Sequence, residues 1–117
     1  MGSPIDAATM ANLLDITGGD QGFVDELVDT YVAEGERIVG ELVTAAEAGA
    51  VADMVRPAHS LKSSSLNVGA LALGELCRRL EQDALDGAVD APVARATEVN
   101  HAFDAARAAL LDERASR

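Results

Sequence analysis

The chain has 117 residues, enough for one domain with a hydrophobic core, and that core must be mainly aliphatic because there are only two Phe, one Tyr and no Trp. The formal net charge of −11 argues against binding to nucleic acid or to an anionic membrane, since both need clustered cations. No apolar run approaches the roughly 20 residues that cross a bilayer and no signal peptide is apparent, so we expect a cytoplasmic protein.

The first predicted helix begins after Ser3, with this serine as its N-cap, Pro4 at the first helical position and Asp6 in the first turn. It ends at Thr17-Gly18-Gly19, because glycine accepts the left-handed conformation that closes a helix. We expect this short helix to lie as a lid across the remaining helices. Residues 1–3 resemble a remnant of an expression vector, and apart from the N-cap at Ser3 we assign them no role.

The second predicted helix begins at Asp20, a good N-cap, and continues to about Ala48, where Gly49 provides a stop. Its apolar residues recur at steps of three and four, which predicts a stripe facing the core: Phe23, Leu27, Tyr31, Ile38, Leu42 and Ala45. Gly35 and Gly40 each weaken a helix by about 1 kcal/mol relative to alanine. They indicate either close helix contact or local softness, and we favour close contact.

The third predicted helix begins near Val51 and carries Pro57, which disfavours a regular helix interior. Either the regular helix begins close to Pro57, after a looser turn, or the helix bends just before His59. We favour the bend, because Met54 and Val55 continue the apolar pattern.

At about 100° per residue, this helix collects its apolar and small residues on one stripe: Met54, Ala58, Leu61, Ser65 and Val68. His59 points well away from the stripe, and Arg56, Lys62 and Ser63 lie within about one turn on its own face. The imidazole should therefore be exposed to solvent beside basic and hydroxyl groups.

A tight turn at Gly69 is expected to reverse the chain into a fourth helix, which ends at Asp86-Gly87. The inward stripe of that helix should contain Leu73, Leu76, Leu80 and Ala84. A fifth helix starts near Ala91-Pro92, and its heptad-like core positions are Val93, Ala96, Val99, Phe103, Ala106 and Leu110. Its tail, residues 112–117, should fray.

Short connections make neighbouring helices antiparallel. The sequence therefore predicts an all-α fold, a single domain over residues 1–117 built as an antiparallel up-down four-helix bundle with a short additional N-terminal helix. We see no strand pattern and no repeat. The single cysteine, Cys77, can form no internal disulfide and is interpreted as a small core residue.

The segment from His59 to Gly69 resembles the signature of the histidine-containing phosphotransfer (Hpt) domains. That signature reads His-x-x-Lys-Gly, then small residues, then a glycine ten positions after the histidine, and here the matching residues are His59, Lys62, Ser63 and Gly69. Ser63 departs from it, because the family most often has glycine there. Serine is small enough that we expect partner docking to survive. The order and lengths of the predicted helices extend the resemblance over nearly the whole chain.

The resemblance implies that His59 accepts a phosphoryl group, with Lys62 stabilising the phosphate. Glu81, 22 residues later, stands where some members carry a side chain that faces the histidine, and it is our candidate for orienting the imidazole. The implied partners are response-regulator receiver domains, which would supply Mg²⁺, and a hybrid histidine kinase. Residues expected at or near the docking site are Arg56, Ser63, Leu66, Gly69 and Arg78.

Several alternatives remain open from the residues alone. A solvated histidine and lysine, a non-catalytic helical adaptor that binds a receiver or another helical partner, and a purely structural bundle are all compatible with the pattern. His101 stands among acids without a following lysine and is interpreted as a surface residue. No metal-ligand spacing and no nucleotide-binding motif occurs, so we expect no cofactor, no metal and no kinase activity, in a monomeric protein.

Overall fold

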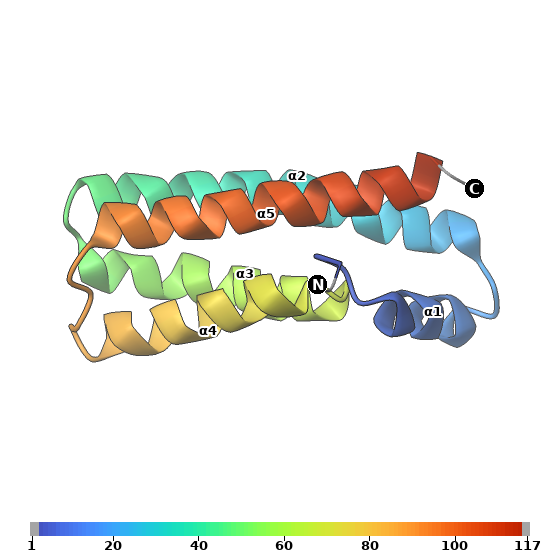
Figure 1. The fold of residues 1–117 in the computed structure, drawn as a ribbon, viewed down its shortest axis with the longest axis horizontal. Helices are drawn as coiled ribbons and strands as arrows, with labels where there is room; N and C mark the ends of the chain where they lie inside the picture. Colours follow the sequence, from blue (N-terminus) through green and yellow to red (C-terminus); the bar gives the residue numbers. More distant parts are fainter. Residues whose placement is uncertain (1–2, 116–117) are drawn as a thin grey trace.

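The computed structural model describes residues 3–115, which contain helices and no strand. The elements are α1 (Ala7–Ile16), α2 (Gln21–Glu47), a 3₁₀ turn (Val51–Met54), α3 (Val55–Asn67), α4 (Leu71–Leu85) and α5 (Pro92–Ala115). Figure 1 shows α2, α3, α4 and α5 alternating in direction along the longest axis. The predicted all-α bundle of four antiparallel helices with a short N-terminal helix is confirmed. None of the helices in this range is long and apolar enough to cross a membrane.

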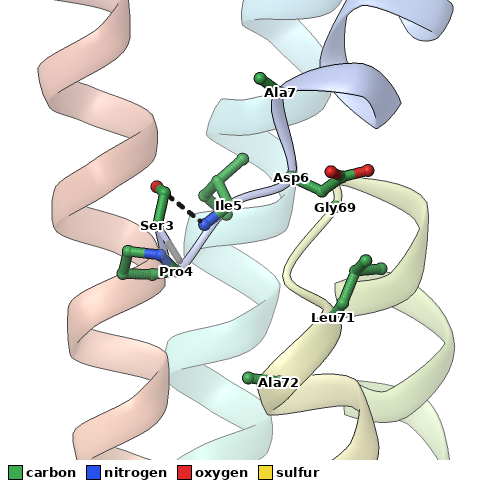
Figure 2. Close-up of a pocket in the computed structure, with 8 residues that line it drawn as sticks. All are labelled: Ser3, Pro4, Ile5, Asp6, Ala7, Gly69, Leu71 and Ala72. Atoms are coloured by element: carbon green, nitrogen blue, oxygen red, sulfur yellow. Dashed lines mark hydrogen bonds between the residues drawn. The ribbon is translucent and has the colours of Figure 1, made fainter. Parts of the chain in front are cut away.

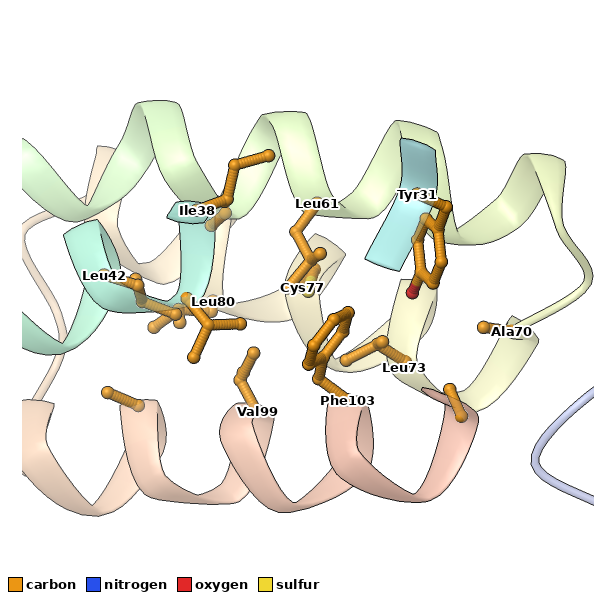
Figure 3. Packing of buried hydrophobic residues seen from close by; sticks show 14 of the residues in the cluster. Tyr31, Ile38, Leu42, Leu61, Ala70, Leu73, Cys77, Leu80, Val99 and Phe103 are labelled. Atoms are coloured by element: carbon orange, nitrogen blue, oxygen red, sulfur yellow. The ribbon is translucent and has the colours of Figure 1, made fainter. Parts of the chain in front are cut away.

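The core lies between α2, α3, α4 and α5 and consists mainly of aliphatic side chains (Figure 3). Its two aromatic residues, Tyr31 and Phe103, contact each other with ring centroids 5.8 Å apart. Cys77 is fully buried among them, as predicted. A Cβ atom at Gly35 would lie only 2.3 Å from Phe103 Cε1, so close contact explains this glycine. At Gly40 nothing lies within 4 Å of such an atom, and there the close-contact prediction is wrong.

The predicted core stripe of α2 is wrong near its N-terminus. Phe23 and Leu27 are 47% and 36% exposed, whereas Val24 and Val28, one position later, are buried. This end of α2 extends past α3 and α4 (Figure 1), and Val24 and Val28 line a cavity there with residues of α1 and α5. The buried face of α2 is therefore shifted by one residue at this end, where α2 packs against α1 and α5 beyond the ends of α3 and α4.

Two smaller errors concern the predicted inward stripes of α5 and α4. Val93, in the first turn of α5, is 50% exposed, and Leu76 of α4 is only partly buried. The remaining predicted core residues of these two helices are buried: Leu73, Leu80, Ala84, Ala96, Val99, Phe103, Ala106 and Leu110.

The start of α1 also differs from the prediction. Asp6, not Ser3, is the N-cap, because its carboxylate accepts hydrogen bonds from Thr9 N and from Thr9 Oγ1. Ser3 Oγ instead accepts from Ile5 N. The helix lies beside the N-terminal half of α2, where it extends one end of the bundle instead of covering it as a lid (Figure 1). Residues 1–2 lie outside the described part of the chain.

Pro57 does not bend a helix interior, so the bend that we favoured is wrong. α3 begins at Val55, directly after the 3₁₀ turn, and Pro57 is its third residue. Amides of the first turn have no carbonyl partner within the helix, so the missing N–H of proline removes no helical hydrogen bond. The alternative, a regular helix that begins close to Pro57 after a looser turn, is correct.

The end of α5 is helical as far as Ala115, although we expected this tail to fray. Arg114 ties it to α2 through hydrogen bonds to the carboxylate of Asp29. Residues 116–117, the rest of the expected tail, lie outside the described residues.

The turn between α3 and α4 also anchors the N-terminal segment. Gly69 has a φ of 82°, and Ala70 N donates back to Ser65 O at 2.8 Å, which closes α3 as predicted. Gly69 O in turn accepts from Asp6 N at 2.7 Å. A Cβ at Gly69 would lie 3.0 Å from Asp6 O, and Figure 2 shows the two residues side by side. Glycine here serves both the turn and the contact with the segment before α1.

Candidate functional site

The buried face of α3 fixes the direction in which His59 points. All residues of its predicted inward stripe are buried: Met54, Ala58, Leu61, Ser65 and Val68. His59 points away from this stripe, and 58% of its side chain is exposed. Lys62, one turn further along, keeps 24% of its side chain exposed. The helix therefore presents an imidazole to solvent with an ammonium group close to it.

The carboxylate of Glu81 joins these two side chains. Glu81 Oε2 lies 2.8 Å from His59 Nδ1, and Oε1 accepts a hydrogen bond of 2.7 Å from Lys62 Nζ. Glu81 belongs to α4, where Leu80 and Ala84 are buried and turn the adjacent position toward α3. The structure thus brings together the three residues that the sequence suggested for the centre of the site.

The hydrogen bond to Glu81 determines which imidazole nitrogen is free. A carboxylate can only accept hydrogen bonds, so the neutral His59 ring carries its proton on Nδ1. The other nitrogen of this exposed ring, Nε2, therefore keeps its lone pair. The pKa of Glu81 is held below its ordinary value mainly by the hydrogen bond from Lys62, and to a smaller extent by the hydrogen bond from His59. Partial burial acts in the opposite direction. Glu81 is therefore ionised at neutral pH, as this role requires.

A glycine allows α3 and α4 to approach closely beside the site. A Cβ at Gly74 of α4 would lie 2.5 Å from Leu66 Cδ2 and 3.7 Å from the carbonyl oxygen of Lys62. Leu66 lies seven residues after His59 on α3, and Gly74 lies seven residues before Glu81 on the antiparallel α4. The Leu66–Gly74 contact therefore lies about two helical turns from the His59–Glu81 contact along the same pair of helices. Gly74 was not among the predicted site residues, although a glycine inside a helix usually has a packing reason and could have indicated this contact.

A buried hydrogen bond holds α3 against α2. The hydroxyl groups of Tyr31 and Ser65 lie 2.8 Å apart, and Ser65 is fully buried. Burial raises the pKa of Tyr31 to about 12, which keeps its hydroxyl protonated. We expected both residues in the core, but only the structure pairs them.

The other residues predicted at or near the site lie on α3, on α4 and in the turn between them. Arg56, Ser63 and Leu66 are exposed on α3, and Gly69 forms the turn that ends it. Arg78 is exposed on α4, and its guanidinium donates to Glu75 of the same helix at 2.6 and 2.8 Å. His101 is exposed on α5, as expected. Within residues 3–115 no group of three or more His, Cys, Asp and Glu side chains is arranged to hold a metal ion.

Comparisons with known proteins identify the fold and the family of the chain. Among solved structures, the crystal structure of histidine-containing phosphotransfer protein B (HptB) from Pseudomonas aeruginosa PAO1 superposes with a TM-score of 0.89 at 26% identity, covering 100% of this chain and 99% of that chain. A search of curated proteins finds no significant match. The sequence matches the Hpt domain family over residues 26–109, which is most of its length. The chain therefore belongs to the Hpt domain family, whose members serve as histidine phosphotransfer intermediates in two-component phosphorelays.

Proposed function

We propose that His59 is the phospho-acceptor of this domain and that it exchanges a phosphoryl group with aspartates of response-regulator receiver domains. The observation that carries this proposal is the hydrogen bond between His59 Nδ1 and Glu81, which leaves Nε2 as the nitrogen with a free lone pair on an exposed ring. A neutral, exposed imidazole nitrogen is the nucleophile that such a transfer needs. The receiver of a hybrid histidine kinase is one of the donors that we propose.

In the transfer, the Nε2 lone pair attacks the phosphorus of an aspartyl phosphate. The N–P bond forms as the P–O bond to the aspartate breaks, and the aspartate leaves as a carboxylate. Because Nδ1 keeps its proton, the imidazole ring of His59 acquires positive charge in the product. Glu81 Oε2, 2.8 Å from Nδ1, is placed to stabilise this charge as it develops. The reverse reaction passes the phosphoryl group to another receiver.

Lys62 supplies positive charge for the phosphate oxygens in this scheme. Its ammonium group is bonded to Glu81 Oε1 at 2.7 Å before transfer. It lies one turn from His59, within reach of a phosphoryl group on Nε2. Lys62 must then weaken its bond to Glu81 in order to contact the phosphate. The proposed Mg²⁺ belongs to the receiver, and this chain contributes the nucleophile, its orientation and a cation.

The receiver is proposed to dock over the exposed face of α3. The small side chain of Ser63 leaves room for a partner beside His59. Leu66 offers an apolar contact because 44% of its surface is exposed. Gly74 provides space under Leu66, so this side chain lies close to α4. The site thereby combines a small apolar surface with a charged centre.

The test is incubation of the protein with a phosphorylated receiver, followed by analysis of the label. We expect acid-labile, base-stable phosphate on the parent and on a His101→Gln variant, which retains the proposed acceptor. A His59→Gln variant should receive none. Equal labelling of the His59→Gln variant and the parent would refute the proposal. Binding of the receiver without any phosphohistidine, unchanged in a His59→Ala variant, would instead favour the non-catalytic adaptor.

A further inference from the structure

Among the cations of the described residues, Arg56 is distinguished by having no carboxylate partner within 4.0 Å. Within residues 3–115, each other Lys or Arg lies within 4.0 Å of at least one carboxylate oxygen. Arg56 makes no such pair, although Asp53 precedes it by only three residues. In a chain with a net charge of −11, an unpaired guanidinium is a local exception to the surrounding negative field.

The position of Arg56 places this free charge beside the proposed acceptor. Arg56 is the second residue of α3 and is exposed. Three residues of helix correspond to about 300°, so Arg56 and Lys62 lie about 60° to either side of His59. The helix therefore carries a cation on each side of the imidazole.

The two cations differ in their availability. Lys62 is held by Glu81 at 2.7 Å, and 24% of its side chain is exposed. A phosphate must compete with Glu81 for Lys62, but it meets no competitor at Arg56. A guanidinium also offers a planar pair of donors that matches two phosphate oxygens.

We propose that Arg56 is the first cation to contact an incoming phosphoryl group and that it binds the group together with Lys62 after transfer to His59. This inference rests on the proposed function and adds an order of events to it. Arg56 draws in the phosphate while the bridge between Glu81 and Lys62 is still intact. Lys62 then joins as the phosphoryl group reaches Nε2.

The experiment uses phosphoramidate, a small donor that removes receiver docking from the measurement. Nε2 attacks phosphorus, the P–N bond of the donor breaks and ammonia leaves, while the proton on Nδ1 stays in place. The variants are Arg56→Gln and Arg56→Lys. The matched control is Arg79→Gln, since Arg79 is an exposed arginine of α4 that makes a long contact of 3.4 Å with Glu75. The rate of phosphohistidine formation is followed by ³¹P NMR at low and high salt.

We expect Arg56→Gln to slow phosphorylation about two- to fivefold at low salt, the effect of one exposed charge contact, and Arg56→Lys to recover part of the loss. Arg79→Gln should match the parent, and the difference should shrink at high salt because of screening. Equal rates for the parent, Arg56→Gln and Arg79→Gln would overturn the role of Arg56 alone. Labelling of the parent at a residue other than His59 would overturn the proposed function and this inference with it.

Discussion

Two glycines of α2 allow a direct test of how α2 and α5 pack. Gly35→Ala would place a Cβ 2.3 Å from Cε1 and 2.6 Å from Cζ of Phe103, whose side chain is almost fully buried. Gly40→Ala, in the same helix, would place its Cβ where nothing lies within 4 Å. The two substitutions share the gain in helix propensity and differ in the contact that they create.

The helix-propensity gain is about 1 kcal/mol for each alanine. Gly40→Ala should therefore stabilise the protein by about 0.5–1 kcal/mol. Gly35→Ala adds an overpacking cost of about 1–3 kcal/mol, because the Phe103 ring has little space into which it can move. The difference in unfolding free energy between the two variants should consequently be about 1–3 kcal/mol, with Gly35→Ala the less stable.

Urea denaturation followed by circular dichroism measures this difference, and each 1 kcal/mol corresponds to about 4 °C in Tm for a domain of this size. In the Gly35→Ala background, Phe103→Leu should cost less than it does in the parent, because the smaller side chain relieves the overlap. If Gly35→Ala stabilised the protein as much as Gly40→Ala, the described contact between α2 and α5 would be wrong.

Three further predictions concern buried or bridging groups. Burial raises the pKa of Tyr31 from 10.0 to about 12, so its phenolate absorbance should appear only near pH 12 in the folded protein. The neutral phenol should contribute its full stabilisation below pH 10, and this contribution should be lost as the pH rises toward 12. Burial likewise raises the pKa of Cys77 to about 12, and its thiol should react with a disulfide reagent at pH 8 far more slowly in the native protein than in denaturant. Glu81→Ala should remove the preference of His59 for the Nδ1–H tautomer, measured by ¹⁵N NMR at neutral pH, and an unchanged tautomer would contradict the bridge.

The helix boundaries were predictable where one local signal was decisive. Asp20 caps α2 and Gly69 ends α3 because each supplies an interaction that depends on a few neighbouring residues. At the start of α1 we expected Ser3 as the N-cap and Asp6 in the first turn, but Asp6 is the N-cap, and its backbone N–H donates to Gly69 O, a tertiary contact that the local pattern does not contain. Similarly, which side of α2 is buried near Val24 depends on where α3 and α4 end, which the pattern of α2 alone does not contain.

The site was predictable to a similar extent. The outward direction of His59 followed from the stripe of α3, and the resemblance pointed to Lys62 and Glu81. Arg78 was expected near the histidine because it lies one turn before Glu81, and the sequence pattern did not indicate that its guanidinium pairs with Glu75, three residues before it on the same helix. Periodicity gives the face of a side chain, but it does not give the partner that the side chain selects.

The bridge at Glu81 has a consequence for the bundle as a whole. Across the described residues, the ion pair that connects α3 with α4 is the one between Lys62 and Glu81, and Glu81 also forms a hydrogen bond with His59. Any event that draws Lys62 away from Glu81 therefore removes an ionic contact between these two helices as well as rearranging the site. If His59 is phosphorylated as proposed and Lys62 then contacts the phosphate, the interaction between α3 and α4 would change with the state of this histidine, and a partner that binds the α3–α4 surface would distinguish the two states without contacting the phosphate itself.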